Sequence, residues 1–90
     1  MGLFSKKKAT VNYNELFKEK YKEVNRLTQS ANNEIDFVIK ESLWANVVSQ
    51  YEELLEYIDK GADYDRHHFE GLLDHAKAEY NKVKGINEDA

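Results

Sequence analysis

Three histidines, His67, His68 and His75, come nearest to forming a metal site by residue type and spacing. Imidazole nitrogens bind transition metals, and a site must bring each of them to about 2 Å from one ion. On a helix, however, the seven residues from His68 to His75 separate the two side chains by about 10.5 Å. Only His75 and Glu79 share a helical face at i,i+4, and they would need further ligands from another helix. We therefore predict neither a metal ion nor another cofactor.

The segment 59–70, DKGADYDRHHFE, has the twelve-residue length of a calcium-binding EF-hand loop. Its carboxylates at loop positions 1, 5, 7 and 12 are Asp59, Asp63, Asp65 and Glu70. The third position is Gly61, which has no side-chain oxygen, and Tyr64 stands where the sharp turn needs glycine. We interpret this segment instead as a helix-ending glycine, Gly61, followed by acidic residues that cap the next helix, with Asp63 or Asp65 as the cap.

Carboxylates are also clustered at Glu52, Glu53 and Glu56, but catalysis has little support in this sequence. A catalytic carboxylate needs a cleft that shifts its pKa, and these three are predicted on the outer face of a helix. There is no cysteine nucleophile, glycine-rich phosphate loop, nucleophile elbow or metalloprotease helix. We predict no enzymatic activity and no catalytic residue.

Binding to another protein fits the same stretch better. Trp44 and Tyr51 belong to residue types that often anchor interfaces, and Glu52, Glu53 and Glu56 form an acidic edge beside them. The competing interpretations are that the two aromatic residues fill the core and that the carboxylates are only solvated. From these five residues we predict a small non-enzymatic protein-binding module of the adaptor or inhibitor type, with a homodimer as one form of it.

The N-terminal segment supports an alternative function. Leu3 and Phe4 are followed by Lys6, Lys7 and Lys8, a combination that favours weak contact with an anionic membrane surface. Each lysine near such a surface contributes about 1 kcal/mol, so the binding would be reversible and sensitive to salt. The alternative is therefore a peripheral membrane adaptor, against the simpler interpretation of a solubilising disordered tail.

Composition restricts the remaining classes. The 90-residue chain contains no proline, no cysteine and four glycines, which favours long helices over a turn-rich β fold. Residues 1–26 carry seven Lys/Arg against three Glu, whereas residues 27–90 carry six against fourteen acidic residues. This acidic balance disfavours nucleic acid as a partner. No apolar run approaches the roughly 20 residues that span a bilayer, so we predict a cytoplasmic protein.

The central helix is predicted over residues 43–60. Its apolar residues fall within an arc of about 140 degrees when the chain advances 100 degrees per residue. They are Leu43, Trp44, Val47, Val48, Tyr51, Leu54, Leu55 and Ile58. Ser42 is the expected N-cap and Gly61 the expected residue after the C-cap. A stripe of this width must pack against two flanking helices.

The first helix is predicted over residues 13–40, with Asn12 or Asn14 as its N-cap. On a helical wheel that places Leu16 at zero degrees, the apolar arc also includes Ile35, Val38 and Ile39, so the apolar face persists to Lys40. The face then changes by about 180 degrees, which predicts a helical hairpin turning at residues 40–42. Three alternatives stay open: an earlier end at the adjacent asparagines 32–33, a strand at 35–40, and a through-helix in a domain-swapped dimer.

The third helix is predicted over residues 65–84, with Gly85 after its end. Together these elements predict an all-α fold, a small antiparallel three-helix bundle with a disordered N-terminal tail. Residues 1–11 are the predicted tail, residues 12–86 the single helical domain, and residues 87–90 a C-terminal tail.

Overall fold

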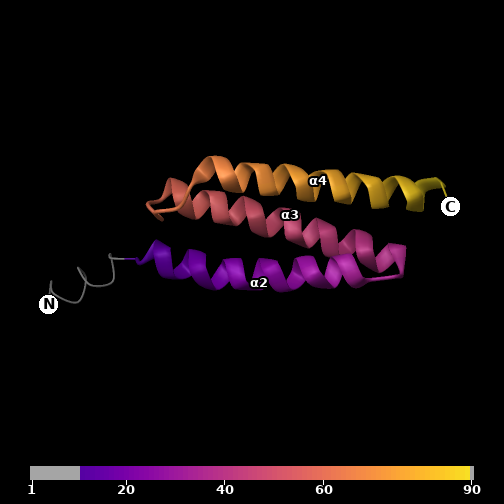
Figure 1. Ribbon diagram of the computed structural model, residues 1–90, viewed down its shortest axis with the longest axis horizontal. Coiled ribbons are helices and arrows are strands. Elements are labelled where there is room, and N and C mark those ends of the chain that lie inside the picture. Colours follow the sequence, from indigo (N-terminus) through magenta and orange to yellow (C-terminus); the bar gives the residue numbers. More distant parts are fainter. Residues whose placement is uncertain (1–10, 90) are drawn as a thin grey trace, which may run out of the picture.

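The computed structural model describes residues 11–89 and contains three α-helices in that range (Figure 1). They are α2 (Tyr13–Asn33), α3 (Phe37–Asp59) and α4 (Arg66–Asp89). Consecutive helices run antiparallel, and α3 lies between its two neighbours. The predicted all-α three-helix bundle is confirmed. The predicted tail at residues 1–11 lies outside the described residues except for Val11.

The first hairpin turns earlier than predicted. Asn12 caps α2 as expected, because its Oδ1 accepts a hydrogen bond from the Glu15 backbone N–H at 3.2 Å. The helix then ends at Asn33, so the predicted end at Lys40 is wrong and the alternative of an early end is right. The cause is Asp36, whose Oδ1 accepts from the backbone N–H groups of Val38 at 2.9 Å and Ile39 at 3.3 Å. This N-cap starts α3 six residues before the predicted cap, Ser42.

Replacing the two competing caps distinguishes them. We expect Asp36→Ala to lower the free energy of unfolding by about 1 kcal/mol, because two N–H groups at the start of α3 lose their acceptor. Ser42→Ala is the matched control and should change it by less than about 0.5 kcal/mol, because residue 42 is exposed inside the helix. Urea unfolding followed by circular dichroism measures both. A larger loss from Ser42→Ala would contradict the capping role of Asp36.

The second hairpin follows the sequence prediction closely. Gly61 has a φ of 125°, and its N–H donates to the Ile58 carbonyl at 3.1 Å. The Ala62 N–H donates to the Tyr57 carbonyl at 2.9 Å, which completes a Schellman motif, and Ala62 is buried beneath it. Asp65 then caps α4, because its Oδ1 accepts from the His67 N–H at 3.1 Å. The predicted roles of Gly61 and Asp65 are both confirmed.

Helix α4 is longer than predicted. It continues through Gly85 to Asp89, so Gly85 does not end the helix and residues 87–89 are helical.

Two glycines lie inside α4, and nothing within 4 Å would meet a Cβ atom at Gly71 or Gly85. Because glycine weakens a helix interior, Gly71→Ala and Gly85→Ala should each raise the free energy of unfolding by about 0.5–1 kcal/mol. Gly61→Ala should lower it, since its φ disfavours a side chain. Thermal unfolding of the three variants checks these signs.

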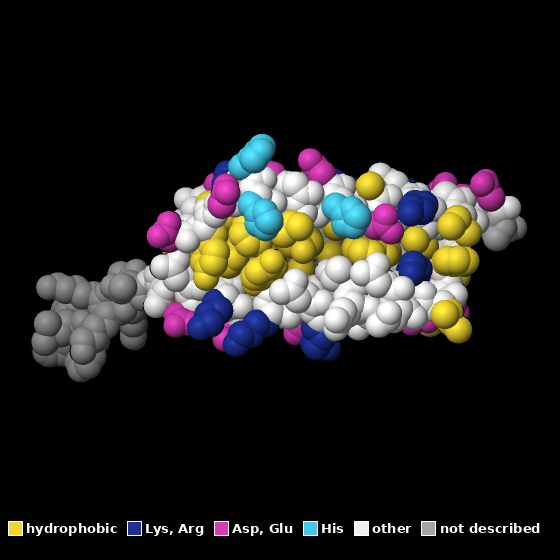
Figure 2. Space-filling model, in the orientation of Figure 1, with side chains coloured by type: hydrophobic (Ala, Val, Ile, Leu, Met, Phe, Trp, Pro, Cys, Tyr) yellow, Lys and Arg dark blue, Asp and Glu magenta, His cyan; other side chains and the backbone are white. Residues whose placement is uncertain are grey.

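The core lies along α3 and is closed at one end by aromatic rings. No Cα atom of α2 lies within 8 Å of a Cα atom of α4 among the described residues, so side chains must span the gap. Phe17 of α2 stacks on Tyr64 with ring centroids 3.9 Å apart and meets Phe69 of α4 edge-on at 4.9 Å. Figure 2 shows hydrophobic side chains along the line between α2 and α4. Phe17 is fully buried, whereas Leu16, at the edge of the predicted stripe, is 42% exposed.

Candidate interaction surface

Trp44 and Tyr51, two of the predicted partner-binding residues, lie in the core. They are 1% and 6% exposed, because α3 turns both rings inward toward its neighbours. The ring of Trp44 meets that of His75 on α4 edge-on at 6.5 Å. Both side chains therefore add almost nothing to the surface of the folded bundle, and they fill the core as in the competing interpretation; a role of theirs in binding a partner stays a prediction.

Burial raises the pKa of the Tyr51 hydroxyl above 10.0; the neighbouring Tyr21 adds to this rise, and a hydrogen bond with Thr28 opposes it. A raised pKa means that the native state holds this proton at a pH where the unfolded chain loses it. The contribution of Tyr51 to stability is therefore complete below about pH 10 and is lost as the pH rises above that value.

We expect the melting temperature of Tyr51→Phe to fall less than that of the wild type as the pH rises through this alkaline window. Phenylalanine has no hydroxyl proton to lose, so the part of the stability loss at alkaline pH that comes from residue 51 disappears. Tyr64→Phe, at a residue 37% exposed, is the control and should follow the wild type. Calorimetry at neutral and alkaline pH measures the difference. Parallel curves for Tyr51→Phe and wild type would contradict the assignment.

The three predicted carboxylates, Glu52, Glu53 and Glu56, are exposed on α3 as expected. Two of them have ion pairs: Glu53 lies 3.3 Å from the Lys20 Nζ of α2, and Glu56 lies 3.6 Å from the Lys60 Nζ. Farther along the same edge, Asp59 pairs with Arg66, and Asp65 caps α4. The acidic edge is therefore partly neutralised within the bundle, which weakens its attraction for a basic partner.

The histidines do not form a metal site in the described part of the chain. No group of three or more His, Asp or Glu residues there could hold a metal ion. His68 instead packs edge-on against Phe69, with ring centroids 5.1 Å apart. His67 and His68 both donate their backbone N–H groups to Asp65. His67 and His68 therefore lie in the first turn of α4, which Asp65 caps.

A surface that the sequence analysis did not single out lies at the end of the bundle opposite the start of α2. Large hydrophobic side chains are exposed there, around the turn between α2 and α3 and near the end of α4 (Figure 2). We define this apolar end as Ile35, Phe37, Val38, Ile39 and Ile86, which are 91%, 45%, 70%, 49% and 41% exposed. Single exposed hydrophobic residues are normal, but several that gather at one end of a molecule are typical of an interaction site.

Two helix ends hold the apolar end together. The Asn87 side chain of α4 donates from Nδ2 to the Phe37 carbonyl at 2.8 Å and to Glu41 Oε1 at 2.8 Å. These bonds join the end of α4, which includes Ile86, to the start of α3. The Asp36 cap fixes the first turn of α3 from the other side. Phe37, Val38 and Ile39 therefore lie on the capped first turn of α3, Ile86 lies near the end of α4, and Ile35 lies in the turn before the cap.

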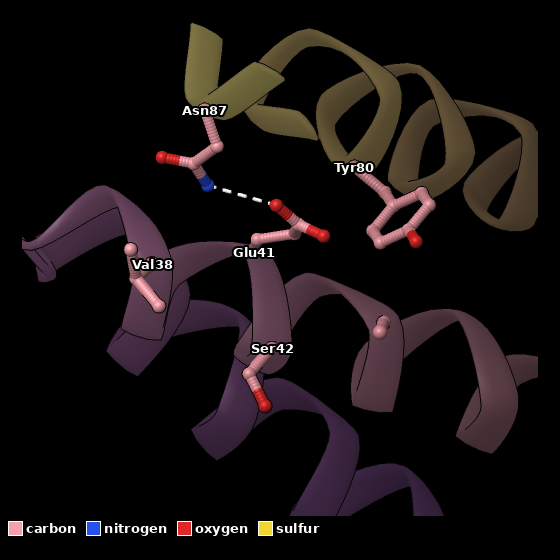
Figure 3. A pocket seen from close by; sticks show the side chains of 6 residues that line it. Val38, Glu41, Ser42, Tyr80 and Asn87 are labelled. Atoms are coloured by element: carbon pink, nitrogen blue, oxygen red, sulfur yellow. Dashed lines mark hydrogen bonds between the residues drawn. The ribbon is translucent and has the colours of Figure 1, made fainter. Parts of the chain in front are cut away.

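A pocket opens beside the apolar end, between α3 and α4 (Figure 3). Its volume is about 430 Å³, and its lining residues are Val38, Glu41, Ser42, Ala45, Tyr80 and Asn87. Val38 belongs to both features, so the pocket continues the hydrophobic surface into the groove between the helices. The carboxylate of Glu41 lies at its rim and already accepts one hydrogen bond from Asn87.

The charge around the apolar end is negative. The nearby carboxylates are Glu34, Asp36, Glu41, Glu88 and Asp89. Two cations lie in the same turns, and both have contacts within the bundle. The Lys40 Nζ donates to the carbonyls of Asn32 at 3.2 Å and Glu34 at 3.3 Å, and the Lys84 Nζ lies 6.0 Å above the Tyr80 ring. A partner of the apolar end would therefore gain from carrying positive charge.

Comparison with protein families, with curated proteins and with solved structures finds no match to this chain. The helices of the described range include no segment that is both long and apolar enough to cross a membrane. The five N-terminal residues predicted to contact a membrane, Leu3, Phe4, Lys6, Lys7 and Lys8, lie outside the described residues.

Proposed function

We propose that this protein is a non-enzymatic protein-binding module and that it binds through the apolar end of the bundle. The observation that carries the proposal is the exposure of five large hydrophobic side chains at one end of the bundle. Their loss of contact with water on binding would supply the main driving force. Capping by Asp36 and the Asn87 bonds fix the surface beforehand, which lowers the entropic cost of association.

The acidic edge of α3 is the competing surface for the same function. Glu52 and Glu53 are exposed on it, and Glu53 forms an ion pair with Lys20. Exposed charges of this kind mainly change association rates and their salt dependence, whereas buried hydrophobic anchors dominate affinity. The apolar end is therefore the surface that we expect to determine the affinity for a partner.

Affinity capture from a lysate of the native host, with three versions of the chain as bait, tests the proposal. The baits are the wild type, the double variant Ile35→Ser/Val38→Ser, and the triple variant Glu52→Lys/Glu53→Lys/Glu56→Lys. Ile35 and Val38 are the two most exposed members of the apolar end, so their replacement should leave the fold intact. Proteins retained by the wild type and lost by the double variant are then purified and titrated directly.

We expect the double variant to lower partner affinity by about 100-fold or more, because two interface anchors of about 2 kcal/mol each are removed. The triple variant should change the affinity by only a few-fold and mostly through the association rate. Unchanged binding by the double variant would refute the proposal. Loss of binding in the triple variant alone would assign the function to the acidic edge.

Contact with a membrane is the second candidate function, and the N-terminal residues support it. Leu3 and Phe4 beside three lysines suit an anionic surface. The apolar end does not suit such a surface, because carboxylates such as Asp36 and Glu88 surround it. Co-sedimentation with phosphatidylserine vesicles, with and without residues 1–11, measures this contact. Vesicle binding that survives the deletion would remove the N-terminal segment from consideration.

A further inference from the structure

We propose that the apolar end and its adjoining pocket receive residues 3–8 of a second copy of this chain. The inference rests on the proposed function, because it names the partner of the same surface. It follows from three properties of the molecule: the chemistry of the apolar end, the chemistry of the N-terminal segment, and the distance between them.

The two surfaces are complementary in composition. The apolar end offers hydrophobic side chains and a pocket, surrounded by carboxylates whose neighbouring cations already have contacts in the bundle. The N-terminal segment has the opposite pattern, with Leu3 and Phe4 followed at once by Lys6, Lys7 and Lys8. An apolar pair would fill the hydrophobic site while the lysines meet the acidic rim.

The pocket determines which residue of the N-terminal segment would meet which residue of the bundle. Val38, Ala45 and Tyr80 provide apolar walls that suit the ring of Phe4. Glu41 at the rim has one oxygen engaged by Asn87 and a second carboxylate oxygen beside the opening. Lys6, two residues after Phe4, would meet that carboxylate.

Distance requires the two surfaces to come from different copies. Helix α2 has 21 residues and is therefore about 32 Å long, and the apolar end lies beyond its C-terminus (Figure 1). A fully extended chain gains about 3.3–3.6 Å per residue, so Phe4 reaches at most about 25 Å from Val11. The segment therefore falls short of the apolar end of its own bundle.

An antiparallel pair of bundles satisfies both copies at once. When two bundles lie side by side in opposite directions, the start of α2 in each lies next to the apolar end of the other. Both contacts then form through one twofold axis, which closes the assembly as a dimer. The same contact without closure would link copies into open chains, so a discrete dimer is the expected product.

Sedimentation velocity from micromolar to millimolar concentration tests the proposal with full-length chains. The wild type should form a dimer that weakens as salt is raised, because part of the contact is between opposite charges. The end variant, Ile35→Ser/Val38→Ser, and the segment variant, Lys6→Glu/Lys7→Glu/Lys8→Glu, should each lower the self-association constant by about 100-fold. Lys18→Glu/Lys22→Glu, on the outer face of α2, is the control for charge reversal and should dimerise like the wild type.

Mixing the two variants gives the decisive result. The segment variant keeps an intact apolar end and the end variant keeps an intact N-terminal segment, so an equimolar mixture should associate although neither does alone. Self-association of the segment variant at the wild-type level would overturn the proposal and indicate that apolar ends pair with each other. A wild type that stays monomeric would also overturn it. If the end variant nevertheless loses a captured partner, the proposed function survives with a different protein as its ligand.

Discussion

Phe17→Ala should lower the free energy of unfolding by about 3–5 kcal/mol, which is a large part of the roughly 5–13 kcal/mol expected for a domain of this size. The ring is fully buried and has three aromatic neighbours, Tyr64, Tyr21 and Phe69, from the second hairpin and from two helices. Since α2 and α4 have no close backbone approach, Phe17 provides much of the direct link between them. Its removal leaves a cavity that the outer helices have to close by moving.

The matched control is Leu16→Ala, at the adjacent residue. Leu16 is 42% exposed, so its truncation should cost less than about 1 kcal/mol. Urea unfolding of both variants measures the difference, and thermal unfolding should show Phe17→Ala about 12–30 °C below the wild type. Equal losses would contradict a core of α2 in which Phe17 is buried and the adjacent Leu16 is half-exposed.

The sequence determines the helical class and several helix ends because those features depend on neighbouring residues. Asn12, Asp65 and Gly61 act through hydrogen bonds or backbone angles within a few residues, so their roles can be predicted from local chemistry. The apolar stripe of the central helix is equally local. It correctly predicts that Leu54 and Leu55 face the core.

The first turn could not be placed in this way because two local signals conflict. Hydrophobic periodicity continues through Ile35, Val38 and Ile39 and so predicts a helix to Lys40. The structure instead uses the Asp36 cap, and those hydrophobic residues become exposed at the end of the bundle. Periodicity assumes that a hydrophobic residue will be buried, and it fails where hydrophobic residues are left on the surface.

The candidate surface was missed for the same reason. An aspartate cap preceded by adjacent asparagines is the signal that could have revealed it, because it moves the turn and leaves Ile35 with no helix to pack on. The partial neutralisation of the acidic edge was also beyond prediction. Lys20 pairs with Glu53 across two helices, and that pairing depends on how the helices are rotated against each other. Tertiary contacts of this kind leave no local pattern.

Trp44→Ala should be the second most damaging substitution, with a loss of about 3–5 kcal/mol. The indole is 1% exposed and is one of the largest side chains in the core. Its Nε1–H has no acceptor among the described residues, so this donor contributes a cost to the folded state while the ring contributes the packing. Trp44→Phe removes the unpaired donor and keeps an aromatic ring. We therefore expect it to lose less than half as much stability as Trp44→Ala.

Circular dichroism during urea unfolding compares the two variants, since both lack the only tryptophan of the chain. In the wild type, tryptophan emission reports the same core, and its shift on unfolding should coincide with the loss of helix if the bundle unfolds in one step. Equal losses from Trp44→Phe and Trp44→Ala would mean that the indole donor finds an acceptor in solution.

Because Trp44 is buried, any partner affinity lost by Trp44→Ala should be proportional to the fraction of unfolded protein. If a fully folded Trp44→Phe variant lost affinity for the partner, Trp44 would instead take part directly in binding.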